Sequence, residues 1–239
     1  MKIIISNLHT TYLPLLLTLF LYLPTLRNGV VWDDRAALLN NPDALGIRPV
    51  FAAFRHDFWG QEIGRDDSHK SYRPISVLTY RINHYFHGVQ PMGYHFVNVL
   101  LHCCAQLLFS CLARGIFEGE KAGGMKTVVS SWLFAVHPIH TEPVCCIVGR
   151  SDLLCTVFYL LALIFYVGAE RQTSTTVYRF CRLLCAYTLG LLSSLSKEVG
   201  LMIFPGESAR IPMISRSLCL SAETMSLSPD RSTTCINIK

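Results

Sequence analysis

The sequence predicts an all-α protein, a bundle of helices that crosses a membrane several times. Apolar residues make up 51% of its 239 residues and charged residues only 15%, whereas a soluble domain carries nearer a quarter charged residues. Several apolar stretches reach or approach the roughly 20 residues that an α-helix needs to cross a bilayer. The formal net charge of +5 comes from residues between these stretches. This placement indicates membrane orientation rather than a patch that binds nucleic acid.

The first 92 residues predict a membrane anchor followed by a polar loop. Residues 3–26 are almost continuously apolar and lack a small-residue cleavage site, so residues 1–26 are expected to form an uncleaved signal anchor whose far end faces the lumen. Residues 27–92 then form a lumenal loop. Its apolar residues predict amphipathic helices, either on the membrane surface or inside a small soluble subdomain. Two sets recur at helical spacing: Phe51, Phe54 and Phe58, and Ile75, Leu78, Ile82 and Tyr85.

Residues 93–204 predict four further membrane spans and the beginning of another. The expected spans are 94–117, 127–136, 153–168 and 177–195, and a last apolar run starts at Val199. The run at 127–136 is too short to cross a bilayer, so the helix is either broken at Pro138 or continues to Val148. One face of the 94–117 helix is polar, which indicates protein neighbours in the bundle; it carries His95, Asn98, His102 and Gln106. Residues 205–239 are serine-rich and are expected to be disordered.

Five polar clusters are predicted to meet on the lumenal face. Basic residues in the short loops at 114–126 and 171–182 mark the cytoplasmic side. Counting crossings from a cytoplasmic N-terminus then puts all five clusters on the opposite side, which suggests one functional site. The clusters are WDDR (32–35), SHKSYRP (68–74), HPIHTE (137–142), GRSD (149–152) and SKE (196–198).

The residues of these clusters suggest chemistry on a lipid-linked phosphate. Asp33 or Asp34 could accept a proton from a hydroxyl as a general base, or the pair could cap a helix. Basic side chains could surround a phosphate, or could be structural residues at the membrane interface. The pair in HPIH favours a hydrogen-bonded core over a metal site, so no metal ligand is assigned. Candidate residues for binding the donor phosphate, or for positioning or protonating the leaving group, are Lys70, Arg73, His137, His140, Glu142, Arg150, Asp152, Lys197 and Glu198.

Several of these segments resemble one family closely. The segments are VWDDRAALLNNPD, FRHDFWG, SHKSYRPISVLTYRINH, GYHFVNVLLH, HPIHTEPVCCIVGRSDLL and SKEVGL. Together, over about residues 28–204, they are similar to the N-terminal membrane region of the transmembrane and tetratricopeptide-repeat-containing proteins. That family resembles the C-type glycosyltransferases in fold. The residues after Pro205 resemble nothing in the family, and its repeats do not follow, so the chain looks truncated.

The resemblance implies a function. Members of the family are multi-pass proteins of the endoplasmic reticulum that transfer mannose from dolichyl phosphate mannose to Ser or Thr hydroxyls of proteins such as cadherins. It implies that Asp33 and Asp34 carry the base, that dolichyl phosphate leaves, and that no cofactor is needed beyond this lipid-linked substrate. The truncated form is expected to show little or no transfer. The alternatives are a non-catalytic membrane scaffold or regulator, and a transporter, although only one interrupted helix is visible.

Overall fold

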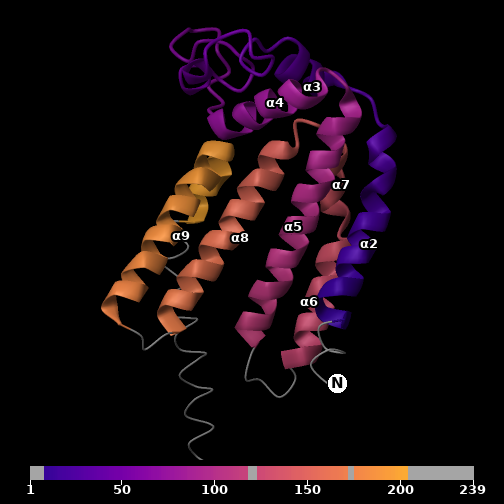
Figure 1. Cartoon of the computed structure of the whole chain (residues 1–239), viewed down its shortest axis with the longest axis vertical. Helices are drawn as coiled ribbons and strands as arrows, with labels where there is room; N and C mark the ends of the chain where they lie inside the picture. Colours follow the sequence, from indigo (N-terminus) through magenta and orange to yellow (C-terminus); the bar gives the residue numbers. More distant parts are fainter. Residues whose placement is uncertain (1–7, 118–122, 172–174, 204–239) are drawn as a thin grey trace, which may run out of the picture. The chain divides into compact units, whose positions relative to one another are not determined.

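The described part of the chain is built from helices. The computed structural model describes residues 8–117, 123–171 and 175–203, in which the only β-pairing is an isolated bridge between His56 and Glu62. The long helices α2, α5, α6, α8 and α9 stand side by side, and α3, α4 and an irregular segment lie over one end of them (Figure 1). The all-α prediction is confirmed for these residues. The expected tail, 205–239, lies outside them.

The first apolar stretch is helical but changes its pitch. A π-helical turn, η1 (Leu8–Tyr12), leads into α2 (Leu13–Tyr22) and a 3-10 turn, η2 (Leu23–Arg27). Proline in α2 and in η2 lies within the first two positions, where the missing N–H is not needed. After residues 28–31 the chain bends by 70° into α3 (Trp32–Asp34) and η3 (Arg35–Leu39). This bend turns WDDR across the end of the bundle.

The loop that follows contains one of the two expected amphipathic helices. α4 (Pro74–His87) is present, with Val77 and Tyr80 buried and Ile82 and Tyr85 exposed. The expected helix across residues 51–58 is wrong. Only a 3-10 turn forms, η4 (Val50–Phe54), because the Asp57 carboxylate accepts the backbone N–H groups of residues 59 and 61 and stabilises a turn.

α5 (Pro91–Phe117) lies at the centre of the bundle. It contacts α2, α6 and α8. Asn98 donates to the carbonyl oxygen of Cys146 (2.9 Å) and Gln106 donates to that of Ser131 (3.1 Å). The predicted protein neighbours of this polar face are therefore confirmed. All four residues of the face are at most 1% exposed: His95, Asn98, His102 and Gln106.

The third expected span is a broken helix. α6 (Gly123–Val136) ends before Pro138, and two short turns follow, η5 (Pro138–His140) and α7 (Thr141–Cys145). α8 (Arg150–Arg171) then starts at the GRSD cluster. α9 (Thr176–Ser196) packs along α8, and η6 (Glu198–Met202) follows the SKE cluster. The first of the two alternatives for this region, a break at Pro138, is the one observed.

Fewer helices could cross a membrane by themselves than the sequence predicts. In the described ranges, α5 and residues 150–170 of α8 are long and apolar enough, and the bent pair 8–27 and 32–39 could form a third span. α6 has 14 residues, and α9, with 21, does not reach the same apolar composition. Each of these two helices packs against a longer neighbour, α6 against α5 and α9 against α8. The orientation of the bundle stays a prediction.

Candidate functional site

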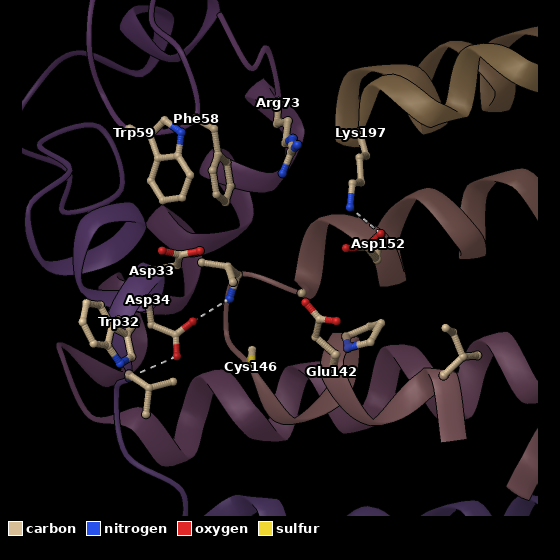
Figure 2. A pocket seen from close by; sticks show the side chains of 15 residues that line it. Trp32, Asp33, Asp34, Phe58, Trp59, Arg73, Glu142, Cys146, Asp152 and Lys197 are labelled. Atoms are coloured by element: carbon tan, nitrogen blue, oxygen red, sulfur yellow. Dashed lines mark hydrogen bonds and ion pairs between the residues drawn. The ribbon is translucent and has the colours of Figure 1, made fainter. Parts of the chain in front are cut away.

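A cavity of about 580 Å³ lies where the polar clusters meet (Figure 2). Its walls come from α3, from the loop before α4, from η5 and α7, from the start of α8, and from the residue after α9. Each of the five predicted clusters contributes at least one side chain. The lining residues are Val31, Trp32, Asp33, Asp34, Phe58, Trp59, Arg73, Ile139, Glu142, Pro143, Cys146, Val148, Gly149, Asp152 and Lys197.

The two aspartates of WDD differ in their surroundings. The Asp34 side chain is buried, and its carboxylate accepts the backbone N–H of Val31 (3.3 Å) and that of Val148 (2.9 Å). It caps α3 and ties it to a segment 114 positions away in the chain. Asp33 is exposed, and its carboxylate makes no hydrogen bond or ion pair with any residue that the structure describes. Asp33 is therefore available for chemistry, whereas Asp34 holds the backbone.

Two cations line the cavity, and each faces a carboxylate. Lys197 Nζ lies 2.6 Å from Asp152 Oδ1, and Arg73 Nη2 lies 3.1 Å from Glu198 Oε2. The Arg73 guanidinium also lies over the Phe58 ring, 5.1 Å from its centroid. Both pairs are partly exposed, and such pairs contribute roughly 0–1 kcal/mol. An anionic ligand can therefore replace either carboxylate at little cost.

The wall formed by α7 and the start of α8 depends on Gly149. A Cβ at this position would lie 2.3 Å from the carbonyl oxygen of Pro143, closer than real contacts allow. This close approach brings Glu142 on α7 and Asp152 on α8 to the same cavity (Figure 2). Only glycine fits there, which gives the first residue of GRSD a packing role.

Arg150 does not line the cavity, although the sequence placed it among the phosphate-binding candidates. Its side chain is fully buried. The guanidinium donates to Asn98 Oδ1 (3.0 Å), Asn83 Oδ1 (2.8 Å) and the carbonyl oxygen of Tyr94 (2.9 Å), and lies 4.8 Å from the centroid of the Tyr80 ring. The charge is solvated by dipoles and ring faces inside the bundle. A donor phosphate in the cavity would not meet it.

Four more candidates do not line the cavity, and one of them, Glu198, meets it only as the ion-pair partner of Arg73. Lys70 donates its ammonium to the carbonyl oxygens of Ile63 (2.8 Å) and Arg65, and so holds its own loop. His137 Nδ1 accepts the N–H of Ile139 (3.2 Å) and caps η5. The ring of His140 packs against Phe134, with centroids 4.5 Å apart.

Sequence reasoning missed the aromatic wall. Phe58 and Trp59, from the FRHDFWG segment, line the cavity beside Asp33 (Figure 2). Trp32 also lines it, is 92% exposed and has a φ of 25°, which side-chain-bearing residues rarely adopt. An exposed aromatic residue on a strained backbone is a signal of function. Cys146 lines the cavity too, and burial raises the pKa of its thiol.

Comparison with known proteins finds relatives over most of this chain. It is 46% identical over 150 residues to the protein O-mannosyl-transferase Tmtc1 of Drosophila melanogaster, covering 63% of this chain and 17% of that protein. It is 39% identical over 187 residues to the protein O-mannosyl-transferase TMTC4 of Mus musculus, covering 72% of this chain and 25% of that protein. It is 40% identical over 187 residues to the protein O-mannosyl-transferase tmtc2 of Xenopus laevis, covering 78% of this chain and 22% of that protein. The chain thus spans about a quarter or less of the length of these relatives. No protein-family model and no solved structure matches it.

Proposed function

Because this chain belongs to the family of the TMTC protein O-mannosyl-transferases, we propose that it carries the catalytic face of such an enzyme in the membrane of the endoplasmic reticulum. Mannose passes from dolichyl phosphate mannose to a serine or threonine hydroxyl of a secretory-pathway protein, a cadherin for example. The observation that carries the proposal is the cavity itself. It places Asp33, without a partner among the described residues, together with two cations, Arg73 and Lys197.

In the proposed reaction Asp33 is the general base. Its carboxylate accepts the proton of the acceptor hydroxyl while the hydroxyl oxygen forms a bond to the anomeric carbon of mannose. The bond from that carbon to the phosphate oxygen breaks, and dolichyl phosphate leaves with the electron pair. Attack from the face opposite the leaving group inverts the anomeric configuration. A positioned base contributes about 10²–10⁴ to such a rate.

Arg73 and Lys197 hold the phosphate in this proposal. The phosphate gains one negative charge as its bond to the sugar breaks, so cations that are already in place stabilise the transition state more than the ground state. Their present partners, Glu198 and Asp152, are partly exposed and can turn to water when the donor binds. The planar guanidinium of Arg73 can bind two phosphate oxygens at once, which a lysine cannot do.

The second candidate function is a non-catalytic membrane scaffold of the same compartment. One observation favours it. Both cations that line the cavity already face carboxylates at 2.6 and 3.1 Å, as in a site that binds no anion. In that case the ion pairs hold the end of α9 to α8 and to the loop before α4, and neither Asp33 nor a donor lipid takes part in any reaction.

A graft of this chain into a full-length relative tests the proposal. Residues 1–203 replace the matching segment of mouse TMTC4, and mannosyl transfer from dolichyl phosphate mannose to a folded acceptor domain is measured in microsomes. We expect transfer by the graft, a loss of about 10²-fold or more with Asp33→Asn, and a raised KM for the donor with Arg73→Ala. Asp67→Asn is the control, since Asp67 pairs with Arg65 at the surface. A well-expressed graft that transfers no mannose would instead favour the scaffold.

A further inference from the structure

A short stretch of backbone, residues 146–148, forms the floor between Asp34 and the buried core. It joins α7 to α8, and we call it the 146–148 segment. On one side, the N–H of Val148 donates to Asp34 Oδ1 at 2.9 Å. On the other side, Asn98 Nδ2 donates to the carbonyl oxygen of Cys146 at 2.9 Å, and the Tyr80 hydroxyl donates to that of Ile147 at 2.9 Å. Three successive residues are thus fixed by three different parts of the fold.

Arg150 fixes the two side chains that hold this segment from below. Its Nε donates to Asn98 Oδ1 (3.0 Å), which leaves the Asn98 amide nitrogen, and not its oxygen, turned toward Cys146. Its guanidinium lies 4.8 Å from the centroid of the Tyr80 ring, and it also donates to Asn83 Oδ1 on α4. All of these side chains are at most 4% exposed. The network therefore has little freedom to rearrange.

We propose that Arg150, Asn98 and Tyr80 are positioning residues, which act through the 146–148 segment and Asp34 to hold Asp33 at the reacting atoms. The inference rests on the proposed function, because Asp33 is the base there. The order of contacts is direct: Arg150 holds Asn98 and Tyr80, these hold the 146–148 segment, Val148 holds Asp34, and Asp33 is the preceding residue of the same turn.

The way in which Arg150, Asn98 and Tyr80 are arranged supports a role in positioning Asp33, beyond packing in the core. Its donors end on backbone carbonyls of the cavity wall, and the far side of the same wall binds the Asp34 carboxylate. A displacement of about 1 Å in a reacting group can cost on the order of 10²-fold in rate. A single hydroxyl at Tyr80 can therefore change the rate of transfer without changing how much donor binds, because Tyr80 does not line the cavity.

The test compares Tyr80→Phe with Tyr85→Phe in the full 239-residue chain. Each change removes one tyrosine hydroxyl from α4, but Tyr80 is fully buried and Tyr85 is 83% exposed. The first readout is the rate at which a small water-soluble alkylating reagent labels Cys146, resolved by mass spectrometry, since Cys146 lines the cavity. The second readout is kcat and KM for dolichyl phosphate mannose in the grafted relative.

We expect Tyr80→Phe to raise the labelling of Cys146 about 10-fold and to lower kcat about 10-fold with an unchanged KM, while Tyr85→Phe changes neither. Unchanged labelling by Tyr80→Phe would show that the network does not hold the segment. Faster labelling of Cys146 with an unchanged kcat would show that the network only stabilises the segment, and would overturn the proposal that it positions Asp33. A parent graft without transfer overturns the proposed function instead, while labelling in the chain itself still decides whether the network holds the segment.

Discussion

Replacing Asp33 and Asp34 one at a time by asparagine should separate catalysis from stability. Asparagine keeps the size of the side chain and removes the charge. The Asp33 carboxylate has no partner among the described residues, so Asp33→Asn should change the free energy of unfolding by less than about 0.5 kcal/mol. The same change should lower mannosyl transfer by about 10²–10⁴ through loss of the general base.

Asp34→Asn should act mainly on stability. The carboxylate accepts two backbone N–H groups, from Val148 at 2.9 Å and from Val31 at 3.3 Å. Asparagine keeps one oxygen acceptor, and its NH₂ group faces the second backbone N–H, which then has no acceptor. A hydrogen bond to a charged group contributes roughly 1.5–3 kcal/mol, and an unsatisfied buried donor costs about 1–3 kcal/mol. We therefore expect the free energy of unfolding to fall by roughly 2–4 kcal/mol.

The assay measures both quantities on the same preparations. Unfolding is followed in mixed micelles of increasing denaturing detergent, and transfer is measured per folded molecule in the grafted relative. Asp34→Asn should retain more transfer per folded molecule than Asp33→Asn. Equal stability of Asp34→Asn and the parent would contradict the structural role of Asp34, and mannosyl transfer by Asp33→Asn at the parent rate would contradict the catalytic role of Asp33.

Three further predictions test other parts of the fold. Gly149→Ala should destabilise the chain by about 1–3 kcal/mol or prevent folding, because the added Cβ would meet the Pro143 carbonyl oxygen. Gly64→Ala is the control in the same unfolding assay, since a Cβ at Gly64 meets no atom. Equal stability of the two variants would contradict the close contact between Gly149 and Pro143. Trp32→Gly should change the free energy of unfolding by less than about 1 kcal/mol, since the indole is 92% exposed and glycine accepts the φ of 25°; a larger loss would show that the indole packs. A glycosylation acceptor site inserted near Gly64 should be modified in microsomes, and one inserted near Gly123 should not. Modification near Gly123 alone would show that the orientation is the opposite of the predicted one.

The sequence by itself determined the helical class and most helix positions. Apolar length and composition are local properties, and a helix satisfies its own backbone hydrogen bonds, so α5, α8 and α9 begin and end close to where the residues predicted. It also indicated that five distant polar clusters share one site, because alternate crossings return the chain to the same face. The expected helix across 51–58 failed because a single side chain, Asp57, stabilises a turn that helical spacing does not reveal.

Only the tertiary structure decided which member of each cluster faces the cavity. Asp33 and Asp34 are equivalent in the sequence, and one becomes buried because its carboxylate meets the N–H of Val148, 114 positions away. Arg73 and Arg150 are likewise both plausible phosphate ligands, yet Arg150 turns into the bundle, where Asn83 and Asn98 from two other helices solvate its charge. The direction of a polar side chain depends on partners brought by other segments, and spacing along one segment does not contain that information.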